Sequence, residues 1–121
     1  MITYPEAKKY APLARKVDLA AFLKSRFPKS LIYDPQKKRY RDSLRKELEI
    51  FKGDDGYYHY KNWETRERAS DGIEFLIRYR INPKTNYPYT FFEAVEALLD
   101  FAVEQKIKQM DKTTLYDTYL K

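Results

Sequence analysis

Cysteine is absent from this sequence of 121 residues, and histidine occurs once, at His59. Without cysteine the chain can form neither a disulfide nor a thiolate metal site. A single histidine also excludes any metal site that needs two histidines. We therefore expect a protein that folds without metal and works without a cofactor.

Long apolar segments are absent as well. No run approaches the roughly 18 apolar residues that span a bilayer, and residues 1–6 (MITYPE) lack the apolar region of a secretion signal. These absences predict a cytoplasmic protein without a membrane partner. A chain of this length is expected to form one domain.

Sequence patterns of catalysis are missing too. There is no glycine-rich phosphate loop and no glycine pattern for a dinucleotide, and His59 has no evident serine or cysteine partner. The one adjacent acidic pair, Asp54-Asp55, is more typical of a solvated turn than of a metal or acid–base site. No Asp-x-Asp pattern occurs that could hold the Mg²⁺ of phosphoryl transfer. The sequence predicts a protein that is not an enzyme.

Basic and aromatic residues, in contrast, are abundant. The formal net charge is +6, and aromatic residues make up 17% of the chain, with 12 tyrosines. Phosphates pair with Lys and Arg, and bases stack on aromatic rings. The combination favours nucleic-acid binding, although a basic protein with half-buried tyrosines and no charged ligand has the same composition.

Helical signals lie at both ends of the chain. Each expected helix begins with a Thr or Asp at the N-cap position, in three cases with Glu three residues later. Pro12 should interrupt the first helix, and Pro28 should end the second. The expected N-caps are Thr3, Asp18, Asp71 and Thr90.

Residues 31–60 change to the two-residue period of strands. Segments 31–33 and 37–41 flank a turn, and segments 48–52 and 57–60 flank Gly53-Asp54-Asp55-Gly56, a strong hairpin signal. Residues 82–89 are expected to be a loop. The predicted fold class is α+β, a small antiparallel sheet flanked by N- and C-terminal helices. Residues 1–104 should form the domain, and the polar segment 105–121 is either a tail or a docking helix.

A basic cluster occupies ten residues in the middle of the chain. On a strand, Lys37, Arg39 and Arg41 share one face, and Lys38 and Tyr40 share the other. Such a row can follow a phosphate backbone, with Tyr40 as a stacking ring. The alternative is a solvated edge strand that is charged to prevent aggregation. The cations of the cluster are Lys37, Lys38, Arg39, Arg41, Arg45 and Lys46, opposed only by Asp42.

A second cluster alternates aromatic and cationic residues, as a stacking platform for single strands would require. His59, inside it, is more typical of a strand residue that faces solvent or packs on its neighbours than of a base-stacking ring. The alternative for the other rings is a place in a small core. The cluster consists of Tyr57, Tyr58, Tyr60, Lys61, Trp63, Arg66 and Arg68.

Several segments carry a family resemblance. Residues 17–23 (VDLAAFL) form a short Asp-Leu helix, 58–63 (YHYKNW) end a hairpin, 70–76 (SDGIEFL) begin a helix, and 91–98 (FFEAVEAL) close the series. In this order they resemble the N-terminal zinc-ribbon domain of bacterial DNA primases. The resemblance is closer to the degenerate versions that precede Toprim domains in plasmid and phage primase-like proteins, and it covers about residues 17–100.

The resemblance implies a zinc-ribbon-like fold that has lost its zinc. Residues 40–44 take the place of one ligand pair, and Tyr60 and Trp63 stand at the cysteine positions of the other. We therefore expect Tyr60 and Trp63 to be core residues that replace the metal. Tyr58, Lys61, Arg66 and Arg68 remain candidates for nucleic-acid contacts. No Toprim domain follows, so polymerase or nicking chemistry is not expected in this chain.

In primases this domain helps to read a single-stranded template. The resemblance therefore implies a non-enzymatic single-stranded DNA-binding accessory module of a mobile-element replication or priming system, working with a primase, polymerase or helicase. The alternative is a protein–protein adaptor that docks on such a partner without touching DNA. A regulator of double-stranded DNA is a weaker third possibility, because no helix-turn-helix spacing supports it.

Overall fold

The computed structural model describes residues 4–65 and 67–106. Two helices come first, followed by five strands, a helix, a small hairpin and a long helix. The elements are α1 (Tyr4–Ala14), α2 (Leu19–Arg26), β1 (Leu31–Asp34), β2 (Arg39–Asp42), β3 (Leu48–Lys52), β4 (Tyr58–Asn62), β5 (Ser70–Asp71), α3 (Gly72–Tyr79), β6 (Ile81–Asn82), β7 (Tyr87–Pro88) and α4 (Phe91–Lys106).

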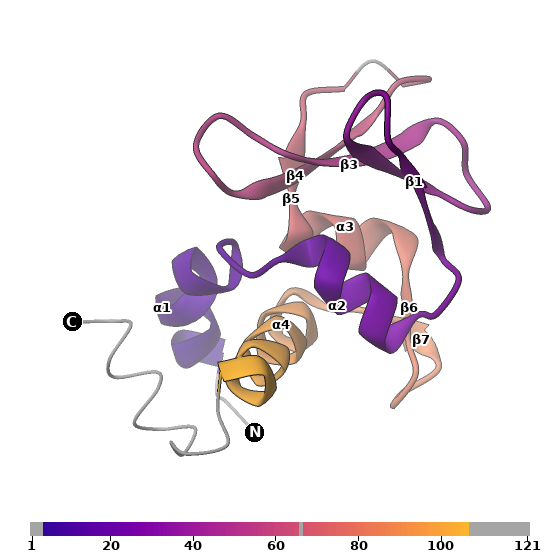
Figure 1. The fold of residues 1–121 in the computed structure, drawn as a ribbon. Coiled ribbons are helices and arrows are strands. Elements are labelled where there is room, and N and C mark those ends of the chain that lie inside the picture. The colour runs from indigo at the N-terminus through magenta and orange to yellow at the C-terminus, as the bar shows by residue number, and fades with distance from the viewer. Residues whose placement is uncertain (1–3, 66, 107–121) are drawn as a thin grey trace.

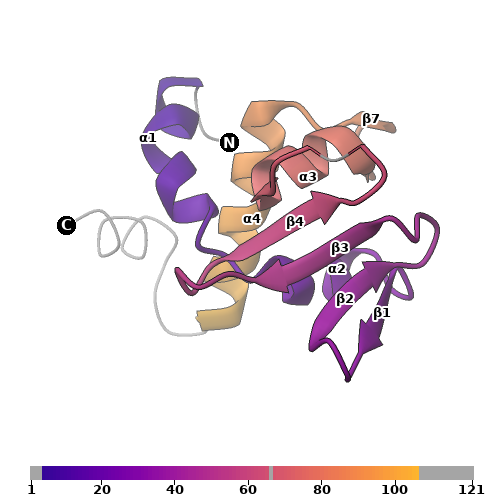
Figure 2. The same cartoon turned by 90° about the horizontal axis from the view of Figure 1, so that it is seen from above.

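Strands β1 to β5 form one antiparallel sheet in which every strand pairs with its neighbour in sequence. Figure 1 shows the helices gathered beneath one face of this sheet, and Figure 2 shows the opposite face from above. No helix or strand within residues 4–65 and 67–106 covers that opposite face, which we call the outer face. The predicted α+β class, with an antiparallel sheet flanked by N- and C-terminal helices, is confirmed.

The core lies between the inner face of the sheet and the helices. Leu48 and Ile50 of β3 and Tyr60 of β4 belong to one buried cluster with Phe75 of α3, which is fully buried. Helix α4 packs beside both α1 and α3, with Leu98 at 0% exposure. The long C-terminal helix therefore joins the N-terminal helix to the layer that supports the sheet.

Three helices begin with the predicted caps. The Asp18 carboxylate accepts a hydrogen bond from Ala21 N at α2, and Asp71 does the same for Glu74 N at α3. At α4, Thr90 Oγ1 accepts from Glu93 N at 3.1 Å while the Glu93 carboxylate accepts from Thr90 N at 3.0 Å, a complete capping box. Thr3, the remaining predicted cap, lies outside the described residues.

The sequence predicted that Pro12 would interrupt the first helix. This prediction is wrong, because α1 continues through Pro12 to Ala14. Pro12 lacks one backbone N–H donor, and only Leu13 and Ala14 follow it in the helix. The loop expected at 82–89 contains the short hairpin β6–β7, whose turn places Asn86 at a positive φ of 64°. Helix α4 runs two residues beyond the boundary drawn at 104, and residues 107–121 of the expected tail lie outside the described residues.

The second strand starts later than expected. Lys37 and Lys38 belong to the turn after β1, where Lys38 has a φ of 56°, and β2 begins at Arg39. The Asp34 carboxylate holds this turn by accepting hydrogen bonds from the backbone N–H groups of Gln36 and Lys37. The basic row along one strand therefore reduces to Arg39 and Arg41.

Candidate nucleic-acid interface

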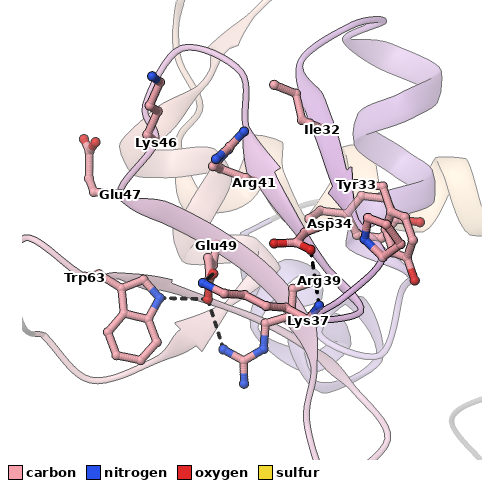
Figure 3. A pocket seen from close by; sticks show the side chains of 12 residues that line it. Ile32, Tyr33, Asp34, Lys37, Arg39, Arg41, Lys46, Glu47, Glu49 and Trp63 are labelled. Atoms are coloured by element: carbon pink, nitrogen blue, oxygen red, sulfur yellow. Dashed lines mark hydrogen bonds and ion pairs between the residues drawn. The ribbon is translucent and has the colours of Figure 1, made fainter.

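A groove of about 800 Å³ crosses the sheet from the end of β4 to the edge strand β1. Figure 3 shows its side chains from close by. Cations, three aromatic residues and three acidic residues line it, so its chemistry is mixed rather than uniformly basic. It is lined by Ile32, Tyr33, Asp34, Pro35, Lys37, Arg39, Tyr40, Arg41, Lys46, Glu47, Glu49 and Trp63.

The pleat of the sheet decides which side chains reach the outer face. Glu49 of β3 lies directly opposite Arg41 on one neighbouring strand and Lys61 on the other. Residues opposite each other in an antiparallel pair share a face. Arg41, Glu49 and Lys61 thus form a row across three strands. Arg39 lies two residues before Arg41, and Trp63 lies two residues after Lys61. Side chains two positions apart point to the same side, so both also lie on the outer face.

Glu49 occupies the centre of this face. Its Oε1 accepts hydrogen bonds from Trp63 Nε1 at 2.8 Å and from Arg39 Nη1 at 3.0 Å, and its Oε2 lies 3.6 Å from Lys37 Nζ. These contacts are marked in part in Figure 3. The side chain of Glu49 is only 12% exposed. One carboxylate therefore holds a ring and two cations of the groove.

The ionisation of Glu49 follows from these contacts. Burial alone would raise the pKa of its carboxyl. The hydrogen bonds from Trp63 and Arg39, together with the positive charge of the neighbouring cations, outweigh that effect and hold the pKa below its usual value. Glu49 is accordingly an anion at neutral pH.

Two cations of the outer face lie over aromatic rings. The Arg39 guanidinium is 4.4 Å from the centre of the Phe51 ring, and Lys61 Nζ is 4.2 Å from the centre of the Trp63 ring. At these distances the positive charge is attracted to the face of the ring. Lys61 is thus placed beside Trp63 at the end of the groove.

Of the two residues expected to replace zinc, only Tyr60 lies in the core. Its ring is 3% exposed and meets Phe75 and Tyr79 edge-on, with centroids 5.3 and 5.6 Å away. The expectation of a buried Trp63 is wrong, because Trp63 is 50% exposed. Strand β4 ends at Asn62, and the alternation of the strand carries the next side chain to the outer face.

The predicted stacking rings Tyr40 and Tyr58 lie on the inner face of the sheet. Tyr40 is opposite the buried Ile50, and its hydroxyl accepts a hydrogen bond from Lys24 Nζ of α2 at 2.7 Å. Tyr58 packs against the core, and burial raises the pKa of its hydroxyl. Both side chains therefore alternate with the outer-face residues Arg39, Arg41 and Lys61, although Tyr40 still contributes to the lining of the groove.

The remaining predicted contacts are spread around the molecule. Lys38 is exposed in the β1–β2 turn, and Arg68 is exposed between β4 and β5. Arg45 lies over the Tyr79 ring at 5.6 Å, and Lys46 is exposed beside it in the β2–β3 loop. Arg66 lies outside the described residues. Lys46 alone of these residues lines the groove.

The structural roles of two buried polar residues, at the ends of β2 and β4, were not predicted from the sequence. The Asp42 carboxylate accepts from the backbone N–H groups of Leu44 and Arg45, and it pairs with Arg80 at 2.8 Å. Asn62 closes the turn after β4 by the same pattern. The signal that could have revealed them is an Asx residue that closes a turn after a strand.

These strand ends are the places where the resemblance would put metal ligands. Within residues 4–65 and 67–106 no cluster of three or more His, Asp or Glu side chains could hold a metal ion. None of the helices in the same residues is long and apolar enough to cross a membrane. Side-chain hydrogen bonds to the backbone organise both turns instead.

Comparison with known proteins gives no relative for this chain. No family model, no curated protein and no solved structure matches it.

Proposed function

We propose that this protein binds single-stranded DNA on the outer face of its sheet, without catalysing a reaction. The observation that carries the proposal is the half-exposed Trp63 ring, which lies on the same uncovered face as Arg41 and Lys61. An exposed ring next to cations offers a base a stacking surface and offers the phosphates their counter-charges.

The geometry favours a single strand over a duplex. Stacking on Trp63 requires a base whose face is free, and bases in a duplex stack on each other. The groove is framed by β strands and turns, and within the described residues no helix projects from the outer face to enter a major groove. A flexible strand can instead lie across the sheet from Trp63 toward β1.

A binding role fits the chemistry of the groove better than catalysis does. Glu49, the acidic group at its centre, is shared by three donors and held ionised. A carboxylate in that state is poorly suited to accept or release a proton near neutral pH. We therefore assign the groove to recognition.

The biological setting of the proposal rests on the sequence resemblance. A degenerate primase zinc-ribbon module would serve replication or priming of a mobile element in the cytoplasm, beside a primase, polymerase or helicase. Tyr60, Asp42 and Asn62 would then maintain the two strand ends that zinc holds in the resembling domains.

The test is the binding of a labelled mixed-sequence oligonucleotide of about twenty bases at low salt. Replacing a stacking ring typically costs about 1–3 kcal/mol, so Trp63→Ala should weaken binding by roughly 5- to 150-fold while changing the salt dependence little. Tyr87→Ala is the matched control, because Tyr87 is 73% exposed in the β6–β7 hairpin. Absence of wild-type binding, or equal affinities of the two variants, would contradict the proposal.

A second surface favours the adaptor function as an alternative. Leu44, 92% exposed, and Ile81, 51% exposed, border a groove with Phe27, and Lys29 lies at its rim. An acidic segment with apolar side chains from a replication enzyme would complement this surface. Leu44→Asp should then abolish docking of the partner and leave oligonucleotide binding unchanged. If the Leu44→Asp variant still binds the partner protein as the wild type does, this alternative is ruled out.

A further inference from the structure

The basic cluster contains cations with different surroundings, and these differences bear on DNA binding. Resting on the proposed function, we propose that Glu49 acts as an internal counter-ion that withdraws Lys37 and Arg39 from phosphate binding, and that Arg41 and Lys46 bind the phosphates. In the same arrangement Glu49 is the positioning residue for the Trp63 ring.

The positions of Lys37 and Arg39 support the first part. Both cations point at the Glu49 carboxylate, Arg39 with a hydrogen bond of 3.0 Å and Lys37 at 3.6 Å. Arg39 is held further by the Phe51 ring beneath its guanidinium. A phosphate that approached them would meet the charge of Glu49, which is 12% exposed and therefore weakly screened by water.

The counter-ion arrangement changes what these residues contribute to DNA binding. Each phosphate contact gains affinity by releasing condensed counter-ions from the nucleic acid. Lys37 and Arg39 already have a protein anion as their counter-ion. Contact with a phosphate would break that pairing and leave the partly buried charge of Glu49 less well compensated. Their net contribution to the salt dependence is therefore close to zero.

Arg41 and Lys46 have no such partner. Both side chains are exposed, and within residues 4–65 and 67–106 neither forms an ion pair with an acidic group. Figure 3 shows their charged ends directed toward the same side of the groove, away from the Glu49 carboxylate. A phosphate backbone can follow this side while a base reaches Trp63.

Glu49 also fixes the orientation of the stacking ring. The indole Nε1–H donates to Oε1 at 2.8 Å, and the carboxylate is itself held by Arg39. A ring that is oriented before binding loses less side-chain freedom when a base stacks on it. The same carboxylate thus orients the ring and neutralises the cations closest to it.

The test measures the slope of log affinity against log salt for an oligonucleotide of about twenty bases. A phosphate contact on a single strand contributes roughly 0.7 to this slope. Lys46→Gln should lower its magnitude by about 0.7, and Lys37→Gln should leave it unchanged. The two variants are matched, because both remove one exposed lysine from the same groove.

Two further variants test Glu49 directly. Glu49→Gln keeps an oxygen acceptor for Trp63 Nε1 but frees Lys37 and Arg39, so the slope should steepen by about 1.4, corresponding to two phosphate contacts. Glu47→Gln, its matched control, removes one negative charge from the same groove without releasing an ion pair, and it should leave the slope unchanged.

Each alternative result is decisive. If Lys37→Gln and Lys46→Gln flatten the slope equally, or if Glu49→Gln behaves like Glu47→Gln, the division of the cluster is wrong while DNA binding stands. If the wild type does not bind the oligonucleotide, the proposed function fails and this inference fails with it. The lysine comparison does not depend on the folding of the Glu49 variant.

Discussion

Tyr60 and Trp63 lie three residues apart, and the pleat of β4 sends their rings to opposite faces of the sheet. Tyr60 meets two aromatic rings of α3 in the core. Trp63 has one hydrogen bond to Glu49 and one cation over its ring, with half of its surface in water. The two residues therefore contribute unequally to stability.

We predict that Tyr60→Ala destabilises the protein by about 3–5 kcal/mol, because truncating a buried aromatic ring removes burial and leaves a cavity. Trp63→Ala should cost about 1–2 kcal/mol, mainly for the lost hydrogen bond to a carboxylate. Urea unfolding followed by circular dichroism measures both. A larger loss for Trp63→Ala than for Tyr60→Ala would mean that the indole supports the fold more than its exposure suggests.

Sequence patterns explain part of this residue-level picture. The hairpin signal around residues 53–56 correctly indicated a strand at 57–60, which the structure places at Tyr58–Asn62. The family resemblance then grouped Tyr60 with Trp63, because the corresponding cysteines of a zinc site must face the same ion. Residues an odd number of positions apart on a continuing strand cannot share a face. The residue that shares the inner face with Tyr60 is Asn62, which is buried. Because Asn62 is polar, the sequence did not indicate that it would be buried.

The pairing of Glu49 with the cations of the basic cluster could not be predicted from the sequence either. Glu49 is eight residues from Arg41 in the chain, yet the register of β2 with β3 places them opposite each other. The segment from Lys37 to Lys46 therefore appears basic along the chain, opposed only by Asp42. In space, Lys37 and Arg39 contact the carboxylate of Glu49.

At the scale of elements, the start of α4 is stabilised by a capping box that can be recognised in the sequence. Thr90 and Glu93 satisfy each other's backbone N–H groups in the capping box. We predict that Thr90→Ala lowers the free energy of unfolding by about 1 kcal/mol, because a helical N–H loses its acceptor. Thr90→Ser, which keeps the hydroxyl, is the control in the same urea experiment. Equal stability of Thr90→Ala and the wild type would show that solvent replaces the cap.

Elements with strong local signals were the ones that the sequence predicted well. The hairpin around Gly53–Gly56 and the caps at Asp18, Asp71 and Thr90 correspond to the structure. Strands β5, β6 and β7 have two residues each, too few to show any period, and they exist because a neighbouring strand pairs with them.

At the scale of the whole molecule, the buried tyrosines couple stability to alkaline pH. Burial raises the pKa of Tyr60 to about 12 and also raises the pKa values of Tyr58 and Tyr89. An unfolded chain releases these protons near pH 10. The folded state therefore binds more protons than the unfolded state above pH 10, and stability present below that pH is lost as the pH rises toward 12.

We predict that Tyr60→Phe loses less stability than the wild type between about pH 10 and 12, because the variant lacks the hydroxyl whose pKa burial raises to about 12. Urea unfolding at a series of alkaline pH values measures the difference, with the curves compared after normalising each to its value at pH 8. Lysine titration is common to both proteins and cancels. Parallel curves would show that Tyr60 ionises in the folded state as easily as in the unfolded one.

The order of the sheet also has a consequence for folding kinetics. Each strand from β1 to β5 pairs only with the strand next to it in sequence, so the sheet assembles from short loops. The packing of α1 on α4, in contrast, joins segments near opposite ends of the described chain. Closing that long loop costs more entropy than any hairpin does. During synthesis the hairpins can therefore form while α4 is still inside the ribosome, and the docking of α1 on α4 completes the domain last.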